Sequence, residues 1–108
     1  MGDVVPIDIA KARLQFVLRD IVQERQAQDE RFGEQLDKSW PRWQTVLDEE
    51  VGEVARCINE AADANVPVIA MKEEVYIAFY SEVIQVAAVA VKMAERLIQA
   101  RYHDKAPD

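Results

Sequence analysis

The fold is decided by residues 82–92, which read EVIQVAAVAVK. Apolar residues fill nearly every position from Val83 to Val91, so on a helix they cover almost the whole circumference. A helix that is apolar all round is normally buried on every side. A chain of 108 residues has too few other helices to enclose it. We therefore expect an all-α helical bundle whose core is completed by oligomerisation.

The rest of the chain divides around this segment by helical periodicity and by its turn residues. Apolar residues recur at helical spacing over residues 9–29, 41–64 and 71–102, which predicts three helices. Asp8 is the expected N-cap of the first helix, and Gly33 its expected end. The predicted plan is an extended lead-in over 1–8, one helical domain over 9–102 and a polar tail over 103–108.

Length and charge exclude several classes of protein. The length allows one domain, and 20 acidic against 13 basic residues give a net charge of −7. Such a surface argues against binding a nucleic acid polymer, which needs a basic face. Cys57 is the single cysteine, so no disulfide framework is expected and a reducing, cytoplasmic setting is favoured. No apolar stretch approaches the roughly 20 residues that span a bilayer, so no membrane partner is expected.

Acidic residues gather where apolar neighbours also lie. Glu49, Glu50 and Glu53 share one side of the second predicted helix, and Glu82 sits in the most apolar part of the third. Two carboxylates about 4 Å apart repel by roughly 4 kcal/mol at an effective dielectric of about 20. Converging acids therefore need a cation, and all-oxygen ligands suit Mg²⁺ or Mn²⁺ better than Zn²⁺. The alternatives are a solvated acidic face, and an ion pair between Glu82 and a base such as Arg56.

The order of the motifs adds a resemblance. EEVGE at residues 49–53 is followed about 30 residues later by EVIQVAAVA at 82–90, and ERQAQDERFG at 24–33 precedes both. This arrangement resembles the MazG-like family of all-α nucleoside triphosphate pyrophosphohydrolases, and in particular its short phage and cassette-type members. The family motif reads E-E-x-x-E, a spacer, then E-x-x-D.

The resemblance implies a fold, a reaction and a metal site. Glu50, Glu53 and Glu82 would be Mg²⁺ ligands, and Glu49 and Glu53 would orient or deprotonate the attacking water. The fourth ligand position, normally Asp, is Gln85 here, and a Gln carbonyl accepts without bringing charge. The implied reaction converts a nucleoside or deoxynucleoside triphosphate into its monophosphate and pyrophosphate, in nucleotide-pool cleaning.

Substrate contacts are expected from five residues. Arg25, Gln28, Trp40 and Trp43 are placed near the base, and Lys92 near a phosphate oxygen. Each has a structural alternative: the tryptophans can close the edge of a core, Gln28 can be an ordinary surface residue, and Lys92 can reach past apolar surface to water.

Two other functions stay open on the sequence alone. Gln85 is compatible with a protein that has the same fold and binds nucleotide or metal with little turnover. A helical oligomerisation module, with the acids as a solvated stripe, is the third. In each case we expect a homodimer or homotetramer.

Overall fold

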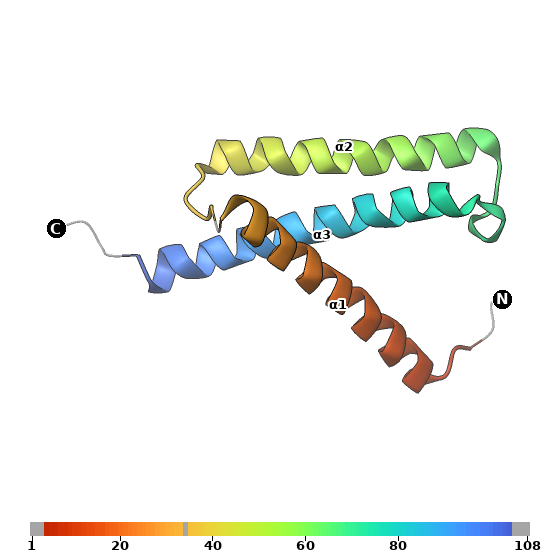
Figure 1. Cartoon of the computed structure of the whole chain (residues 1–108), viewed down its shortest axis with the longest axis horizontal. Helices are drawn as coiled ribbons and strands as arrows, with labels where there is room; N and C mark the ends of the chain where they lie inside the picture. The colour runs from red at the N-terminus through yellow and green to blue at the C-terminus, as the bar shows by residue number, and fades with distance from the viewer. Residues whose placement is uncertain (1–3, 34, 105–108) are drawn as a thin grey trace.

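The described part of the protein consists of three long α-helices and one short 3₁₀ turn (Figure 1). A computed structural model describes residues 4–33 and 35–104, without the side chains at 62–64. The elements are α1 (Ile7–Phe32), α2 (Trp40–Ala64), η1 (Val68–Ala70) and α3 (Glu73–Tyr102). No strand occurs within the described ranges, and the predicted all-α class is confirmed.

The helices form a pair and a crossing arm. Helices α2 and α3 run antiparallel side by side, and α1 crosses α3 near its own C-terminal end before diverging toward its N-terminus (Figure 1). Because α1 packs on α3 much more than on α2, α3 is the helix that both others contact. The apolar segment at 83–91 therefore lies at the centre of the fold, as its composition predicts.

The first helix begins earlier than predicted. Ile7 and Asp8 belong to α1, so the extended lead-in within the described residues is limited to 4–6. Asp8 lies in the first turn rather than at the N-cap, where its charge still suits the positive end of the helix dipole. Gly33 ends the helix as predicted: its φ of 75° is in the left-handed region, and its amide donates to the Asp29 carbonyl.

The other helix ends also have local causes. Ser39 precedes α2, and its hydroxyl accepts a 3.4 Å hydrogen bond from the Arg42 amide, as N-cap residues do. Helix α3 starts at Glu73, two residues later than predicted, because Lys72 keeps an extended ψ of 144°. It ends at Tyr102 as predicted. The lead-in residues 1–3 and the tail residues 105–108 lie outside the described residues.

The core of the single chain is small. Among the described residues, its buried apolar side chains are Leu36, Trp43, Ile84, Ala88 and Val89. Trp43 is 1% exposed, which fits the alternative that a tryptophan closes the core edge. Trp40 is 44% exposed, so that alternative does not hold for it.

Large apolar side chains stay in water on both the arm and the central helix. Leu14, Leu18 and Val22 form a stripe along α1 and are each about half exposed, and Val83 and Val91 on α3 are about 40% exposed. The radius of gyration is 17.4 Å, whereas a compact domain of about 100 residues has about 13 Å. One chain therefore does not bury its own apolar faces.

Helix α3 is also long and apolar enough, by length and composition, to cross a membrane. The expectation that no segment spans a membrane rested on the longest uninterrupted apolar run. The whole helix also includes the residues on both sides of that run, and over its full length it passes the test. The central helix of a soluble bundle passes the same test. Helix α3 contacts both other helices and carries Glu82 and Lys92 on the sides that meet them, although only 22% of its apolar stretch is buried in the single chain.

Candidate functional site

Glu50 on α2 and Glu82 on α3 meet where the two helices pack. Both residues are half-buried, and each has one carboxylate oxygen, Oε2, that is buried without a hydrogen-bond partner among the described residues. Buried polar atoms are nearly always paired, so an unpaired carboxylate oxygen needs an explanation. Two such oxygens on facing helices indicate a site that takes a cation or a hydrogen-bond donor.

Further acids surround Glu50. Burial raises the pKa of the Glu50 carboxyl, and the negative charges of Glu82, Glu53, Glu49 and Glu24, in that order, raise it further. Four of these five residues come from the two predicted motifs, and their charges act on the Glu50 carboxyl across the contact of α2 and α3. The fifth, Glu24, comes from α1.

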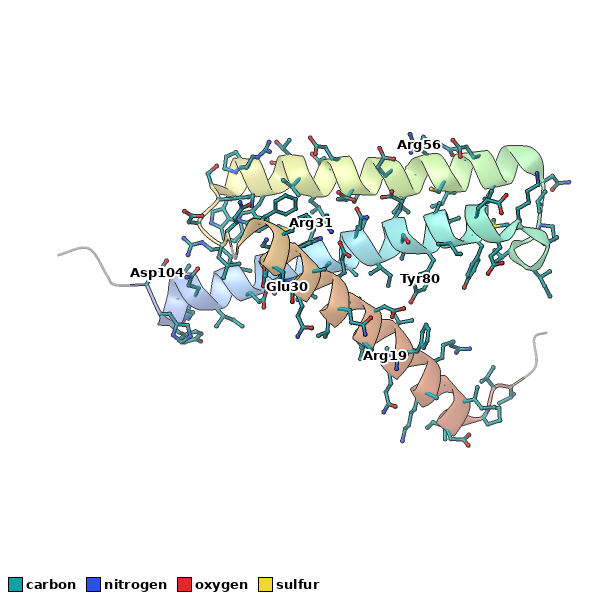
Figure 2. All side chains as sticks on the ribbon, viewed as in Figure 1. Arg19, Glu30, Arg31, Arg56, Tyr80 and Asp104 are labelled. Carbon is teal, nitrogen blue, oxygen red and sulfur yellow. The ribbon has the colours of Figure 1, made fainter. Side chains whose placement is uncertain are left out.

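The acids differ in their surroundings. Glu49 is exposed, and Glu53 forms an ion pair with Arg56, which lies on the side of α2 away from α3 (Figure 2). Arg56 also approaches Glu60, at 4.0 Å, so it serves the acids of its own helix. The alternative that Arg56 neutralises Glu82 does not hold, and no base among the described residues pairs with Glu82.

The donor set fits a hard divalent cation, although its side chains are not gathered for one. No three His, Cys, Asp or Glu side chains of the described part stand close enough to hold an ion as they lie. One contact contributes to this, because the ion pair with Arg56 holds Glu53 away from Glu50 and Glu82. Gln28 Nε2 donates to Glu24 Oε1 over 3.0 Å. An exposed ion pair stabilises by only about 0–1 kcal/mol, so releasing Glu53 from Arg56 costs little. The unpaired oxygens of Glu50 and Glu82 need no release.

A cleft opens beside these acids. Its volume is about 270 Å³, and it is formed where the end of α1, the connector and the middle of α3 face α2. Its lining is Glu24, Gln28, Arg31, Phe32, Gln35, Lys38, Trp43, Val46, Glu50, Gln85, Val89 and Lys92. The lining combines two acids, Glu24 and Glu50, as its acidic part with three cations, Arg31, Lys38 and Lys92, as its basic part, and it includes Trp43. A ligand that carries a metal ion and several phosphates has this charge pattern.

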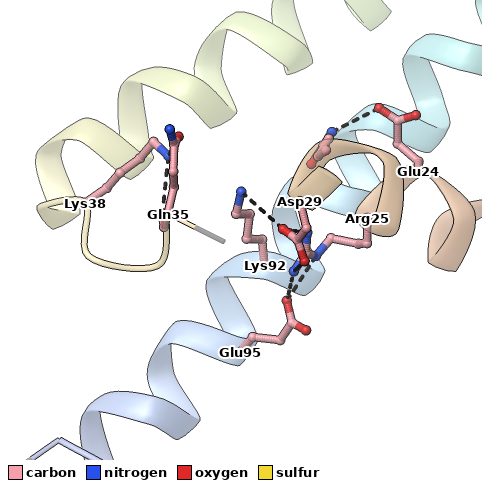
Figure 3. A network of polar contacts seen from close by, with 8 residues as sticks. Glu24, Arg25, Asp29, Gln35, Lys38, Lys92 and Glu95 are labelled. Carbon is pink, nitrogen blue, oxygen red and sulfur yellow. Dashed lines mark hydrogen bonds and ion pairs between the residues drawn. The ribbon is translucent and has the colours of Figure 1, made fainter. Parts of the chain in front are cut away.

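The basic part depends on Lys92 and Lys38. Lys92 is 6% exposed, so it is not the surface lysine of the alternative reading (Figure 3). Burial lowers the pKa of Lys92, the charges of Lys38 and Arg25 lower it further, and Asp29, 3.9 Å from Nζ, acts against them. Two cations that repel each other at one cleft favour an anion between them.

Trp43 adds an unused donor. Its indole Nε1 is buried and has no hydrogen-bond partner among the described residues, although Trp43 lines the cleft. A buried indole N–H normally has an acceptor. Lys38 Nζ lies 5.0 Å from the ring centroid, which places the tryptophan beside the basic part of the cleft.

Two of the predicted substrate contacts lie elsewhere. Arg25 is 6% exposed and bonded to Asp29 and Glu95, and it is not among the described residues that line the cleft (Figure 3). Burial alone would lower the Arg25 pKa, but the hydrogen bonds to Asp29 and Glu95 outweigh it and raise the pKa. Arg25 joins α1 to α3. Trp40 is exposed and also absent from the lining, whereas Gln28, Trp43 and Lys92 lie in it.

Sequence reasoning missed Glu24, Arg31 and Lys38. All three line the cleft. A signal existed for Glu24, because it lies four residues before Gln28 and so on the same helical face. Arg31 and Lys38 gave no comparable signal, since charged residues near a helix end and a connector are usually solvated.

Comparison with protein-family models, with curated proteins and with solved structures gave no match for this chain.

Proposed function

We propose that the protein is a Mg²⁺-dependent nucleotide pyrophosphohydrolase of the MazG-like type, which converts a nucleoside or deoxynucleoside triphosphate into the monophosphate and pyrophosphate. The observation that carries the proposal is the pair of unpartnered, buried carboxylate oxygens on Glu50 and Glu82. Such a reaction serves to clean the nucleotide pool.

The proposed metal site lies at the contact of α2 and α3 beside the cleft, and of its residues Glu50 and Gln85 line the cleft whereas Glu53 and Glu82 do not. Glu50, Glu53 and Glu82 would hold the ion, and the Gln85 carbonyl would add an uncharged ligand. Like charges brought together at the contact of two helices destabilise it unless a cation offsets them. Bound Mg²⁺ would supply charge neutralisation for the triphosphate, and Mn²⁺ is a chemically similar substitute.

The basic part would bind the phosphates that the metal site leaves free. Lys92, Lys38 and Arg31 would offer cations, and the Trp43 indole N–H would donate to a phosphate or base oxygen. Gln28, with both a donor and an acceptor, suits the edge of a base. Glu49 and Glu53 would orient a water and take its proton, so the protein contributes positioning and electrostatics.

We also propose a homodimer or homotetramer in the cytoplasm, with neither a membrane nor a nucleic acid polymer as partner. The exposed apolar stripe of α1 and the half-exposed sides of α3 support another copy as the missing cover. A MazG-like bundle completed in this way would bury the apolar segment at 83–91 on every side.

A second candidate, nucleotide binding with little turnover, is favoured by one specific residue. Gln85 replaces the carboxylate at the fourth motif position, and a site with less negative charge binds Mg²⁺ more weakly. The two candidate functions use the same cleft and differ in the rate at which the bound nucleotide is hydrolysed.

The test measures monophosphate and pyrophosphate after incubation of each nucleoside triphosphate with Mg²⁺. Glu82→Gln keeps the side-chain volume and should abolish product, whereas Asp48→Asn, an exposed acid on α2, should not. Tight nucleotide binding without product would favour the second candidate. If neither Mg²⁺ nor any nucleotide shifts the melting temperature, both fail and the oligomerisation module remains, because a ligand of the native state must stabilise it.

A further inference from the structure

Glu24 borders the same part of the cleft as Gln85. The two residues, one from α1 and one from α3, line both the 270 Å³ cleft that contains Glu50 and a second one of about 370 Å³ on its other side. Glu24 and Gln85 thus stand together at the boundary between the two openings. No other pair of described residues lines both.

Resting on the function proposed above, we propose that Glu24 is a further ligand of the divalent cation, and that it supplies the negative charge which Gln85 lacks. The site would then take carboxylates from all three helices: Glu24 from α1, Glu50 and Glu53 from α2, and Glu82 from α3. Gln85 would remain as a neutral acceptor beside Glu24.

Three observations support this placement. Glu24 is half-buried, so its carboxyl group is at the helix contact rather than in open solvent. Glu24 lines the 270 Å³ cleft together with Glu50 and Gln85. Gln28 Nε2 donates to Glu24 Oε1, which fixes one oxygen and leaves Oε2 for another partner, as hydrogen-bonded carboxylate ligands do.

An independent feature indicates that a ligand enters this cleft. Trp43 is 1% exposed, and its Nε1 has no acceptor among the described residues, yet it lines the cleft with Glu24 and Glu50. Trp43 and Glu50 are seven residues apart on α2 and therefore on one face. A buried donor beside unpaired acceptors calls for a ligand that carries both an acceptor and a cation, as a metal-bound phosphate does.

The experiment measures Mn²⁺ binding to the full chain by the loss of the free-ion signal in electron paramagnetic resonance, without nucleotide. Glu24→Gln should weaken binding by about 10- to 100-fold, the range found when a polar partner is removed from a metal site. Glu30→Gln, the same change at an exposed position of α1, should have no effect. Adding Gln85→Asp to Glu24→Gln should restore most of the affinity, because the charge returns beside its original position. Circular dichroism checks that each variant is folded.

The outcomes separate this proposal from the one it rests on. If Glu24→Gln binds Mn²⁺ as tightly as the wild type while Glu50→Gln and Glu82→Gln do not, Glu24 is not a ligand and the pyrophosphohydrolase proposal stands. Weakening by Glu24→Gln without rescue by Gln85→Asp would overturn the claim that Glu24 replaces the charge missing at position 85. If the wild type does not bind Mn²⁺, or if Glu50→Gln and Glu82→Gln bind it unchanged, the metal site itself is wrong.

Discussion

Arg25 on α1 and Glu95 on α3 are joined by a 2.9 Å hydrogen bond from the guanidinium Nε to Oε2, across 70 positions of sequence. The same guanidinium donates to Asp29 through Nη1, also over 2.9 Å. Arg25 is buried, whereas both of its acceptors are partly exposed. This cluster fixes the point at which the arm α1 crosses the central helix (Figure 3).

Arg25→Met should destabilise the protein. The methionine keeps the apolar stem but leaves Asp29 and Glu95 without their donor, and hydrogen bonds to charged groups contribute about 1.5–3 kcal/mol each. Because the pKa of Asp29 is lowered by Arg25, its contribution is present above the ordinary value of 3.8 and is lost as the pH falls through the folded value. Urea unfolding at pH 7 and pH 3 should show a smaller difference between wild type and variant at pH 3. Arg13→Met, at an exposed position of α1, is the control, and an equal loss in both variants would contradict the prediction.

Tyr80→Phe should loosen α1 from α3 at a second point. The Tyr80 hydroxyl donates to Asp20 Oδ2 over 2.6 Å, and removing it should cost about 1.5–3 kcal/mol. This hydrogen bond raises the pKa of Tyr80 to about 12, so its contribution is complete below pH 10 and is lost as the pH rises through about 12. Chemical unfolding at pH 8 measures the cost. Tyr102→Phe, at a side chain that is 70% exposed, should change the free energy of unfolding little. A similar loss of stability in that variant would contradict the assignment of the Tyr80 effect to its hydrogen bond with Asp20.

The sequence predicted the parts of this site that lie on one helix. The spacing of Glu49, Glu50 and Glu53, and the position of Glu82 within an apolar run, depend only on helical periodicity. Glu24 and Lys38 reach the cleft through the angle at which α1 crosses α3, and no local pattern encodes that angle. The role of Arg25 was mistaken for the same reason, because its partner Glu95 is distant in sequence and looks like an ordinary surface acid.

Glu50→Gln should stabilise the metal-free protein at neutral pH. The pKa of Glu50 is raised by burial and by neighbouring acids, so the favourable protonated form is present below the ordinary value of 4.5 and is lost as the pH rises through the folded value. At pH 7 the neutral amide of the variant removes the cost of the charged, half-buried carboxylate. At pH 4 the substitution has no such cost to remove, because the carboxyl group can be protonated there. Melting in EDTA should show an increase at pH 7, by about 4–8 °C for each kcal/mol of relieved repulsion, and none at pH 4.

Two comparisons check the Glu50 prediction. Asp48→Asn removes the same charge from an exposed position of α2 and should leave the melting temperature nearly unchanged at both pH values. In excess Mg²⁺ the order of the two melting temperatures should reverse. The wild type should then be more stable than Glu50→Gln, because the ion stabilises only the protein that binds it. A destabilised Glu50→Gln in EDTA at pH 7 would mean that the buried oxygen has a partner in solution.

Leu18→Glu should separate the protein into monomers. Leu18 is 49% exposed and lies between Leu14 and Val22 on a stripe of α1 that no described part of the chain covers. Burying a leucine side chain contributes about 1.5–3 kcal/mol, and a symmetric contact counts each substitution twice, so one charge there is enough to break a dimer. Light scattering after gel filtration should give a dimer or tetramer for the wild type and the single-chain mass for the variant. Arg13→Glu, which places a glutamate on the opposite side of α1, should keep the wild-type mass. A wild type that is monomeric at micromolar concentration would mean that α1 and α3 keep their apolar faces in water, and the oligomer would have to be abandoned.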